Sequence, residues 1–189
     1  MLRMLPLLGA LAQAPAPSLT LEIRVFLGTE EVTGQTRVTI HRAGERNAAV
    51  AQGHGPHGPY AFTVPQGIYD AQIVREKDGR VLNIRWAERL IVMPYPDEGG
   101  RHLEVVNFTN GYGALQVRTA RASGVPDVAL FPVGERTSAA ARLPDRSGDG
   151  YLLFVVPAGR YDLQVKDASP TWHADLEVPL DRTRLWIIK

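Results

Sequence analysis

Cysteine is absent from the 189 residues of this chain. Its absence excludes disulfides, thiolate metal sites, a cysteine nucleophile and a lipid-anchored cysteine. A dominant sign of charge is missing too, because the formal net charge is only +1. Such a balance gives no electrostatic reason to expect nucleic acid or an acidic surface as a partner. Lysine occurs only at Lys77, Lys166 and Lys189, so arginine carries most of the positive charge.

Long apolar runs and helical periodicity are also missing. No window shows a convincing 3.6-residue period. The apolar run that follows Arg3, residues 4–11, is far too short to span a bilayer, and no transmembrane segment is predicted. It predicts a secretory signal instead, because small-x-small cleavage sites follow it at Ala12 and Ala14. We expect residues 1–17 to be signal peptide and leader, and the mature protein to be secreted, periplasmic or at the cell surface.

What the chain does contain is one stretch that occurs twice. Residues 154–164 repeat residues 62–72 at a constant offset of 92, with the pattern F-x-V-P-x-G-x-Y-D-x-Q. Each copy predicts a β-hairpin, because alternating apolar residues enter a turn that has Pro first and Gly two residues later. The outgoing strand alternates again, with Tyr161, Leu163 and Val165 on one face. The repeat therefore indicates a duplicated β domain.

The strands around the repeated hairpin also recur in the same order. The offset between matching residues falls from 94 to 82 along the chain, and each change lies in an expected loop. The matching pairs include Leu21 and Leu115, Val38 and Val128, Trp86 and Trp172, and Leu103 and Leu185.

About six or seven short strands in each half, at regular spacing, are typical of a Greek-key sandwich. We predict an all-β protein with two tandem Greek-key, prealbumin-like or immunoglobulin-like β-sandwich domains. The first domain is expected at residues 18–108 and the second at residues 114–189. Residues 109–113 are expected to form the linker, because Asn-Gly and Gly-x-Gly interrupt a strand there.

The second half also resembles a known family. The residues that carry the resemblance are Gly113-Ala-Leu-Gln-Val, Asp127-Val-Ala-Leu, Asp149-Gly-Tyr and Val156-Pro-Ala-Gly-Arg-Tyr-Asp-Leu. They resemble the carboxypeptidase-regulatory-like, prealbumin-like family, in which a D-G-x turn precedes a strand that ends in L-P-x-G-x-Y. The first half is similar more loosely, because a His/Pro loop at residues 53–59 replaces its Asp-Gly turn. The resemblance implies modules that act mostly as spacers, stability elements or binding platforms.

A relative within that family, the collagen-adhesin B-type repeat, carries Lys–Asn isopeptide crosslinks. The crosslink needs a lysine in the first strand, where this chain has Arg24 and Arg118. We therefore expect no such crosslink.

Two short motifs have the spacing of metal ligands. His54 and His57 form H-x-x-H, which can chelate Zn or Cu. Their loop is mostly Gly and Pro, so a solvated loop is the better interpretation. Asp145-Arg-Ser147-Gly-Asp149-Gly150 matches the start of a calcium loop, but Val156 replaces the twelfth-position Glu and a hairpin turn explains the same residues. We predict no metal and no cofactor.

The aromatic side chains are predicted to be mainly structural. Tyr69 and Tyr161 should point inward, and their repetition favours a structural hydrogen bond or tyrosine corner. Trp86 and Trp172 are predicted to lie in the cores. Trp186 is the best candidate for an exposed aromatic at an interface or glycan platform, although a packed edge residue is the favoured interpretation.

No catalytic site is predicted. There is no G-x-S-x-G elbow, no phosphate-binding loop, and no convincing Ser–His–Asp set, because His41, His102 and His173 lie on strands without evident partners. The Asn107-Phe-Thr109 sequon matters only in a glycosylating host.

The favoured function is that of a non-enzymatic structural, adhesive or assembly protein, with a protein partner or self-association through an edge strand such as residues 184–189. The alternative is a carbohydrate-binding or small-ligand module, and the remote alternative is a metal-dependent enzyme.

Overall fold

The computed structural model describes residues 18–95, 99–119, 126–140, 145–146, 150–166 and 169–189. The predicted signal peptide and leader therefore lie outside the described residues. The first half contains η1 (Thr33–Gln35) and the strands β1 (Ser18–Leu27), β2 (Glu30–Glu31), β3 (Thr36–Arg42), β4 (Ala49–His54), β5 (Tyr60–Pro65), β6 (Gly67–Lys77), β7 (Arg80–Val92) and β8 (Arg101–Asn107). The second half contains β9 (Tyr112–Thr119), β10 (Asp127–Pro132), β11 (Asp145–Arg146), β12 (Leu152–Pro157), β13 (Gly159–Lys166), β14 (Thr171–Val178) and β15 (Thr183–Ile188).

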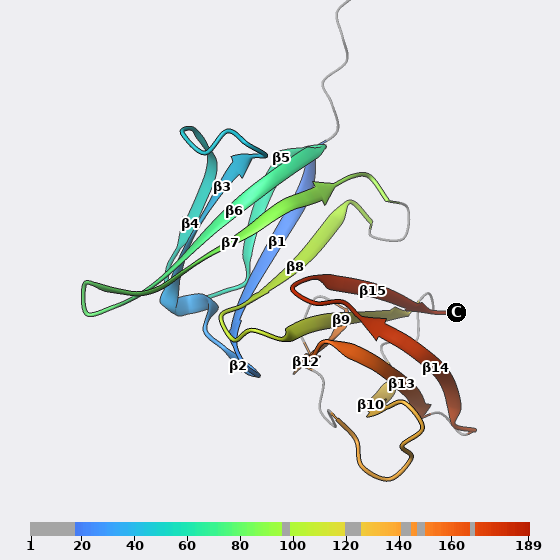
Figure 1. The fold of residues 1–189 in the computed structure, drawn as a ribbon. Helices are drawn as coiled ribbons and strands as arrows, with labels where there is room; N and C mark the ends of the chain where they lie inside the picture. Colours follow the sequence, from blue (N-terminus) through green and yellow to red (C-terminus); the bar gives the residue numbers. More distant parts are fainter. Residues whose placement is uncertain (1–17, 96–98, 120–125, 141–144, 147–149, 167–168) are drawn as a thin grey trace, which may run out of the picture.

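The first half is a sandwich of two sheets (Figure 1). In one sheet β1 lies between β5 and β8, and β2 pairs with the end of β1; the other has the order β4-β3-β6-β7. Between them lies a core of fully buried side chains, because alternate residues of each strand point inward. We call this half the first module.

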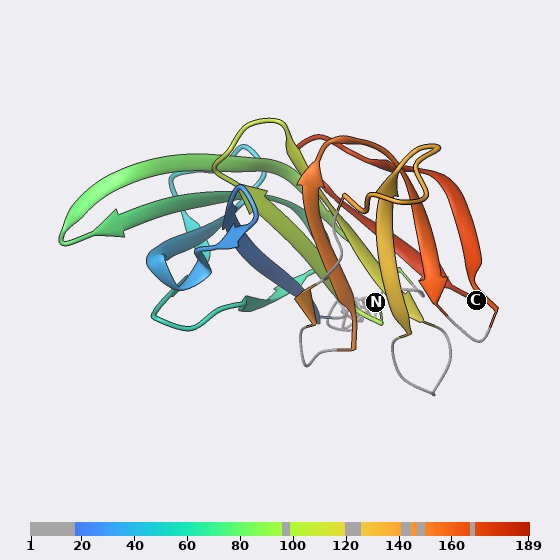
Figure 2. The same cartoon turned by 90° about the horizontal axis from the view of Figure 1, so that it is seen from below.

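The second half repeats this architecture, and we call it the second module. One of its sheets has the order β11-β12-β9-β15 and the other has the order β10-β13-β14. A separate apolar core fills the space between these sheets. The view in Figure 2 shows the two sandwiches beside each other, with the long β6–β7 hairpin projecting from the first. The prediction of an all-β chain with two tandem sandwiches is confirmed.

The strand registers show that the repeats occupy equivalent positions. Leu21 pairs with Phe62 between β1 and β5, and Leu115 pairs with Phe154 between β9 and β12. The first and last strands of each module run parallel to one another, as β1 with β8 and β9 with β15. The predicted matches between the two halves are therefore confirmed at the level of strand pairing.

Each module contains a β-bulge at the repeated aspartate. In the first module Tyr69 pairs with Leu90 and Ala71 pairs with Ala87, so two residues of β7 lie opposite Asp70. The β13–β14 ladder has the same irregularity. A bulge of this kind shifts the alternation of side chains along the bulged strand.

This shift makes the prediction that Trp86 and Trp172 lie in the cores wrong. Both residues are on the outer faces of their sheets and only partly buried. The extra residue of each bulge shifts the alternation by one, so that Ala87 lies opposite the inward Ala71 and His173 lies opposite the inward Leu163. An arginine guanidinium covers each ring instead. Arg46 lies 4.2 Å from the Trp86 ring centre, and Arg136 lies 3.9 Å from that of Trp172.

The repeated tyrosines do point inward, as predicted. The Tyr69 hydroxyl donates a hydrogen bond to the Pro65 carbonyl at 2.7 Å, and the Tyr161 hydroxyl donates to the Pro157 carbonyl at 2.6 Å. Burial raises the pKa of both hydroxyls. The prediction of a structural hydrogen bond is confirmed in both modules. Within the described residues, no helix is long and apolar enough to cross a membrane.

Candidate functional site at the junction of the two modules

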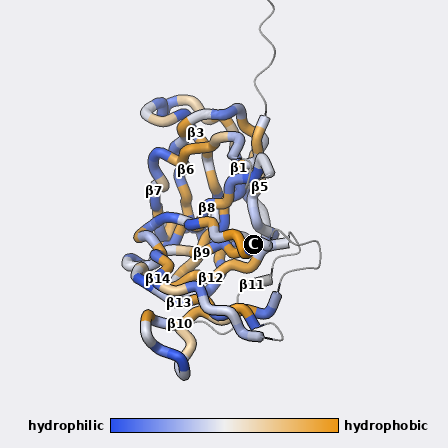
Figure 3. The backbone as a smooth tube through the Cα atoms, turned by 90° about the vertical axis from the view of Figure 1, so that its right-hand side faces the viewer, coloured by the Kyte–Doolittle hydropathy of each residue, from blue (hydrophilic) through white to orange (hydrophobic). Residues whose placement is uncertain are grey.

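The two modules meet through a buried apolar contact between the outer faces of two sheets. Figure 3 shows β8, β9 and β12 together at the middle of the molecule. The contact consists of Phe26 on β1, Leu103 and Val105 on β8, Ala114 on β9, Tyr151 just before β12 and Leu153 on β12, with Val155 packed against them. These residues alternate along their strands with residues that face the two cores, so the sheets are buried on both faces here.

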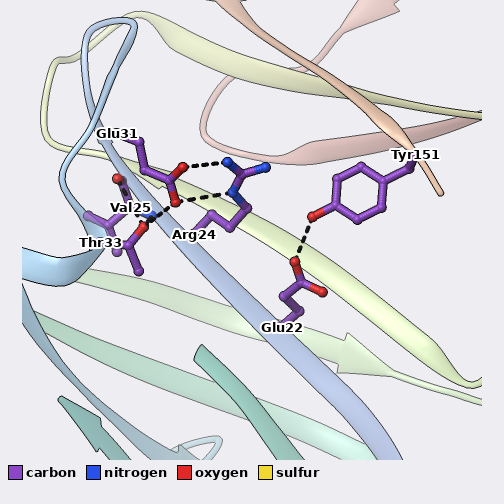
Figure 4. A network of polar contacts seen from close by, with 6 residues as sticks. All are labelled: Glu22, Arg24, Val25, Glu31, Thr33 and Tyr151. Carbon is purple, nitrogen blue, oxygen red and sulfur yellow. Dashed lines mark hydrogen bonds and ion pairs between the residues drawn. The ribbon is translucent and has the colours of Figure 1, made fainter. Parts of the chain in front are cut away.

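A polar contact lies within this apolar region. The Tyr151 hydroxyl donates a hydrogen bond to Glu22 Oε1 at 2.6 Å, in a buried position that joins the two modules (Figure 4). Glu22 Oε2 lies 2.8 Å from Arg101 Nε, which supplies the positive charge that a buried carboxylate needs. The Glu22 residue is 0% exposed, so its carboxylate is closed to solvent.

The same face of β1 presents Arg24, whose guanidinium pairs with Glu31 (Figure 4). Burial alone would lower the pKa of Arg24, but the hydrogen bond and the charge of Glu31 raise it. Thr33 completes the network, because its hydroxyl donates to Glu31 Oε1 at 2.7 Å and accepts from the Val25 amide at 2.8 Å. The network therefore fixes the start of η1 to the strand that meets the second module.

The β14–β15 connection of the second module covers the strand edges of the first module. Thr183 accepts a hydrogen bond from the Val105 amide at 2.7 Å, and its own amide donates to Glu104 Oε1 at 3.0 Å. Arg182 donates to the Glu88 carbonyl at 2.7 Å. These contacts occupy backbone groups on the edges of β7 and β8 that would otherwise be available to another strand.

An ion pair and an amide complete the junction. Arg85 on β7 pairs with Asp181 at 2.5 Å and also donates to Asn110 at 3.3 Å. Asn107 is buried, accepts from the Gly28 and Thr109 amides and donates to the Gly28 carbonyl. The amide of the sequon is therefore part of the connection between the modules.

A cleft of about 250 Å³ lies beside these contacts. Its walls come from β7, the end of β8 and residues 180–182. It holds two arginines, Arg85 and Arg182, and two carboxylates, Glu88 and Asp181, so the charges balance.

The repeated aspartates are buried polar groups with structural partners. Asp70 accepts hydrogen bonds from the Gly44 amide at 3.1 Å and the Arg89 amide at 2.9 Å, and Arg46 lies 3.7 Å away. Burial alone would raise the pKa of Asp70, but these donors lower it. Arg89 is one of the two bulged residues opposite Asp70 and has a φ of 56°. Because Arg89 has no partner in the register of the two strands, its amide donates to the Asp70 carboxylate instead.

Asp162 repeats this arrangement in the second module. Its carboxylate accepts from the Asp175 amide at 2.9 Å, the Gly134 amide at 3.2 Å and Arg136 at 2.9 Å. The hydrogen bond from the Asp175 amide is the largest cause that lowers the pKa of Asp162. Gly134 has a φ of 81°, a conformation that favours glycine. Because both modules use the aspartate in the same way, its role is to hold the bulge.

The two motifs with metal-ligand spacing lie in different surroundings. His54 and His57 are both exposed on the β4–β5 side of the first module. Most of the Asp145–Asp149 motif lies outside the described residues, and only the backbone of its first two residues is placed, in β11. Within the described part of the chain, no three His, Asp or Glu side chains form a group that could hold a metal ion.

The other histidines and the last tryptophan make separate local contacts. His41 Nδ1 lies 3.1 Å from the Ala48 carbonyl, and His102 lies 3.6 Å from Glu104. Trp186 packs against the second core, with His173 against its ring at 5.7 Å. Trp186 is half-buried, in agreement with the interpretation of a packed edge residue.

The junction residues Glu22 and Tyr151 were not predicted from the sequence. A signal was present nevertheless, because residues 151–156 form an unbroken run of six apolar residues. Such a run is typical of a strand buried on both faces, whereas the matching strand β5 alternates apolar and small or polar residues.

No family model matches this chain, and no curated protein matches it. Solved structures similar to it include the Bacillus anthracis TIE protein, at 17% identity and a TM-score of 0.33, covering 90% of this chain and 33% of that protein. This chain therefore spans about a third of the length of that protein.

Two further similar structures come from other bacteria. The tip fimbrial protein Mfa3 from Porphyromonas gingivalis is 11% identical, with a TM-score of 0.32 and coverage of 85% of this chain and 81% of that one. A candidate adhesin from Bacteroides ovatus is 11% identical, with a TM-score of 0.33 and coverage of 85% and 83%. These similarities are loose, with sequence identities of 17% or less.

Proposed function

We propose that this chain is a non-enzymatic protein of the secreted or cell-surface compartment, with a structural, adhesive or assembly role. It works as a rigid unit of two β-sandwiches. The observation that carries the proposal is the buried junction, in which the Tyr151–Glu22 hydrogen bond lies among apolar side chains of both modules. An apolar contact excludes water, and the enclosed hydrogen bond fixes the relative orientation of the sheets.

The perturbed ionisable groups support a structural interpretation over a catalytic one. Asp70 and Asp162 hold equivalent bulges through backbone amides, and Tyr69 and Tyr161 hold equivalent turns. A catalytic pair would not be expected to recur at the same position of both modules with the same backbone partners.

We also infer that both modules are carboxypeptidase-regulatory-like, prealbumin-like sandwiches. What supports this is the role of the P-x-G-x-Y motif, whose tyrosine hydroxyl returns to the proline carbonyl in each copy. Modules of that kind act mostly as spacers or binding platforms, in agreement with a scaffold of fixed shape.

The rigid-unit proposal is tested by small-angle X-ray scattering on the chain from Gln13 onward. We expect a single compact shape, and we expect Leu153→Asp to expand it, because Leu153 is 2% exposed within the junction. Val133→Asp is the matched control, since Val133 is 50% exposed away from the junction. An unchanged scattering profile for Leu153→Asp, with both modules folded, would contradict the proposal.

The assembly role is tested by light-scattering mass over a concentration series, with and without calcium and zinc. A defined oligomer supports the assembly role. A chain that stays monomeric and binds no protein at the cell surface contradicts that role. A metal-dependent change of mass would instead indicate metal binding at His54 and His57 or at the Asp145–Asp149 motif.

A further inference from the structure

The cleft at the junction, between β7, the end of β8 and residues 180–182, has one wall from each module. We call it the junction cleft. Its volume of about 250 Å³ lies below the range of about 300–1,000 Å³ that is usual for drug-sized ligands, so it suits a smaller molecule. Ligand sites occur preferentially at interfaces between domains. The contacts that join the two modules also fix the shape of this cleft, since Arg85 and Arg182 bond across it.

The charged groups that line the junction cleft are accessible to solvent. The side chains of Glu88 and Asp181 are 56% and 46% exposed, and Arg182 is exposed as well. Each of these side chains is already held by a contact within the protein. A ligand therefore meets groups that are ordered before it binds, which lowers the entropic cost of binding.

Existing contacts use only part of the hydrogen-bonding capacity of these side chains. Asp181 pairs with Arg85 through Oδ1, and Glu88 pairs with Arg46 through Oε1. Within the described residues, the second oxygen of each of these carboxylates has no partner. Arg182 donates from Nη2 to the Glu88 carbonyl, and its guanidinium has further N–H donors. Donors and acceptors therefore lie side by side on the walls of the junction cleft.

A hydroxyl group suits such a surface better than a charged group does. Both carboxylates of the cleft are paired with a guanidinium, so a charged ligand would have to compete with an existing ion pair. A hydroxyl both donates and accepts, so it can bond to a carboxylate and to a guanidinium without separating them. The planar guanidinium and carboxylate groups each offer two parallel bonding directions, which match hydroxyls on adjacent carbons of a ring.

The junction cleft also presents apolar surface beside its polar groups. Leu180 is 58% exposed at its rim, and Trp86 lines it from the side of β7. A sugar ring carries C–H groups between its hydroxyls, so it can use both the polar and the apolar parts of the cleft.

We propose that the junction cleft binds one ring of a neutral carbohydrate. The hydroxyls of the ring bond to Glu88, Asp181 and Arg182, and its C–H groups pack on Leu180 and Trp86. This inference rests on the proposed rigid unit, because one wall of the cleft comes from each module, and it names a ligand class for the adhesive role.

The test uses the full chain labelled with ¹⁵N, observed by NMR, with the methyl glycosides of glucose, galactose, mannose and N-acetylglucosamine as probes. We expect at least one probe to shift the Trp86 indole signal, with a dissociation constant of about 1–10 mM for a ligand of so few atoms. Trp86→Phe assigns that signal, and its spectrum shows whether the variant is folded. The control ligands are cyclohexanol, which has a ring without neighbouring hydroxyls, and glycylglycine, which is a zwitterion. Both should leave the signal in place.

Two variants test the polar and the apolar contacts separately. Glu88→Gln keeps the shape of the side chain and should weaken probe binding about fivefold, because a charged acceptor becomes a neutral one. Its matched control is Glu76→Gln, which changes another carboxylate in an exposed ion pair with an arginine. Leu180→Ala should weaken binding about threefold through lost apolar contact. Val133→Ala, at a similarly exposed position away from the cleft, should leave binding unchanged.

The inference is overturned if no glycoside moves the Trp86 signal at concentrations well above this range, or if Glu88→Gln binds the probe as tightly as Glu76→Gln does. An equal shift with cyclohexanol or glycylglycine would overturn the choice of a carbohydrate. The scattering test of the rigid unit needs no ligand. A compact shape without glycoside binding therefore counts against this inference only.

Discussion

One carboxylate can stabilise a β-bulge when it accepts hydrogen bonds from the backbone amides that have no partner in the neighbouring strand. Asp162 does so in the second module, where it receives two amides and the Arg136 guanidinium. Because these donors favour the ionised form, the pKa of Asp162 lies below its ordinary value. The stabilisation that this shift provides is present above the ordinary pKa of about 4 and is lost as the pH falls toward the folded value.

Asp162→Asn should lower the free energy of unfolding at pH 7 by about 1–3 kcal/mol, because a charged acceptor of buried amides is lost. The parent chain should lose part of its stability between pH 7 and pH 3, and the variant should lose less over the same interval. Urea unfolding followed by circular dichroism at the two pH values measures both effects. Asp127→Asn, whose side chain is 55% exposed, is the control. An equal loss for parent and variant would show that Asp162 is not the titrating group.

The residue-by-residue alternation that predicts inward and outward side chains fails where a bulge intervenes. Tyr161 and Leu163 precede and follow the bulge on the unbulged strand, and both were assigned correctly as inward. Trp86 and Trp172 lie on the bulged strands, where the extra residue reverses the pattern. The position of that extra residue depends on pairing with a neighbouring strand, which a single strand's sequence does not encode.

Strand β12 differs from its counterpart β5 in what covers its outer face. On β12, Leu153 and Val155 face the first module, whereas the equivalent Ala61 and Thr63 on β5 are exposed. The repeat predicted that the two strands pair alike, and it could not predict this difference. The contact joins residues from both halves of the chain, so it depends on how two complete sandwiches dock.

Tyr151→Phe tests the polar part of that docking surface. The change keeps the ring in the apolar contact and removes the hydroxyl donor of Glu22, which stays buried. We expect a loss of about 1–3 kcal/mol in the free energy of unfolding, the usual range for leaving a buried acceptor without its donor. Chemical denaturation measures it, and Tyr95→Phe at a 45% exposed position is the control. A loss no larger than that of the control would mean that Glu22 is satisfied without Tyr151.

The two modules should unfold together, since unfolding of either one would expose the apolar side chains that their junction buries. Calorimetry of the parent chain is expected to show one transition. Leu153→Asp should divide it into two, because the modules then melt independently. Two transitions in the parent chain would show that the junction does not couple the modules.

The parallel pairing of first and last strands determines how each module responds to mechanical load. Because β1 and β8 run in the same direction, the start of β1 and the end of β8 lie at opposite ends of one ladder. Tension applied through these two points shears all the hydrogen bonds of the ladder at once, instead of opening them one after another. The same holds for β9 and β15 in the second module.

Single-molecule pulling should therefore show a higher rupture force when a module is held by its first and last strands than when it is held by β1 and β5, which are antiparallel and peel apart. Equal forces for the two attachments would rule this out. A scaffold that joins a cell surface to a partner would, by this geometry, carry tension along its strongest direction.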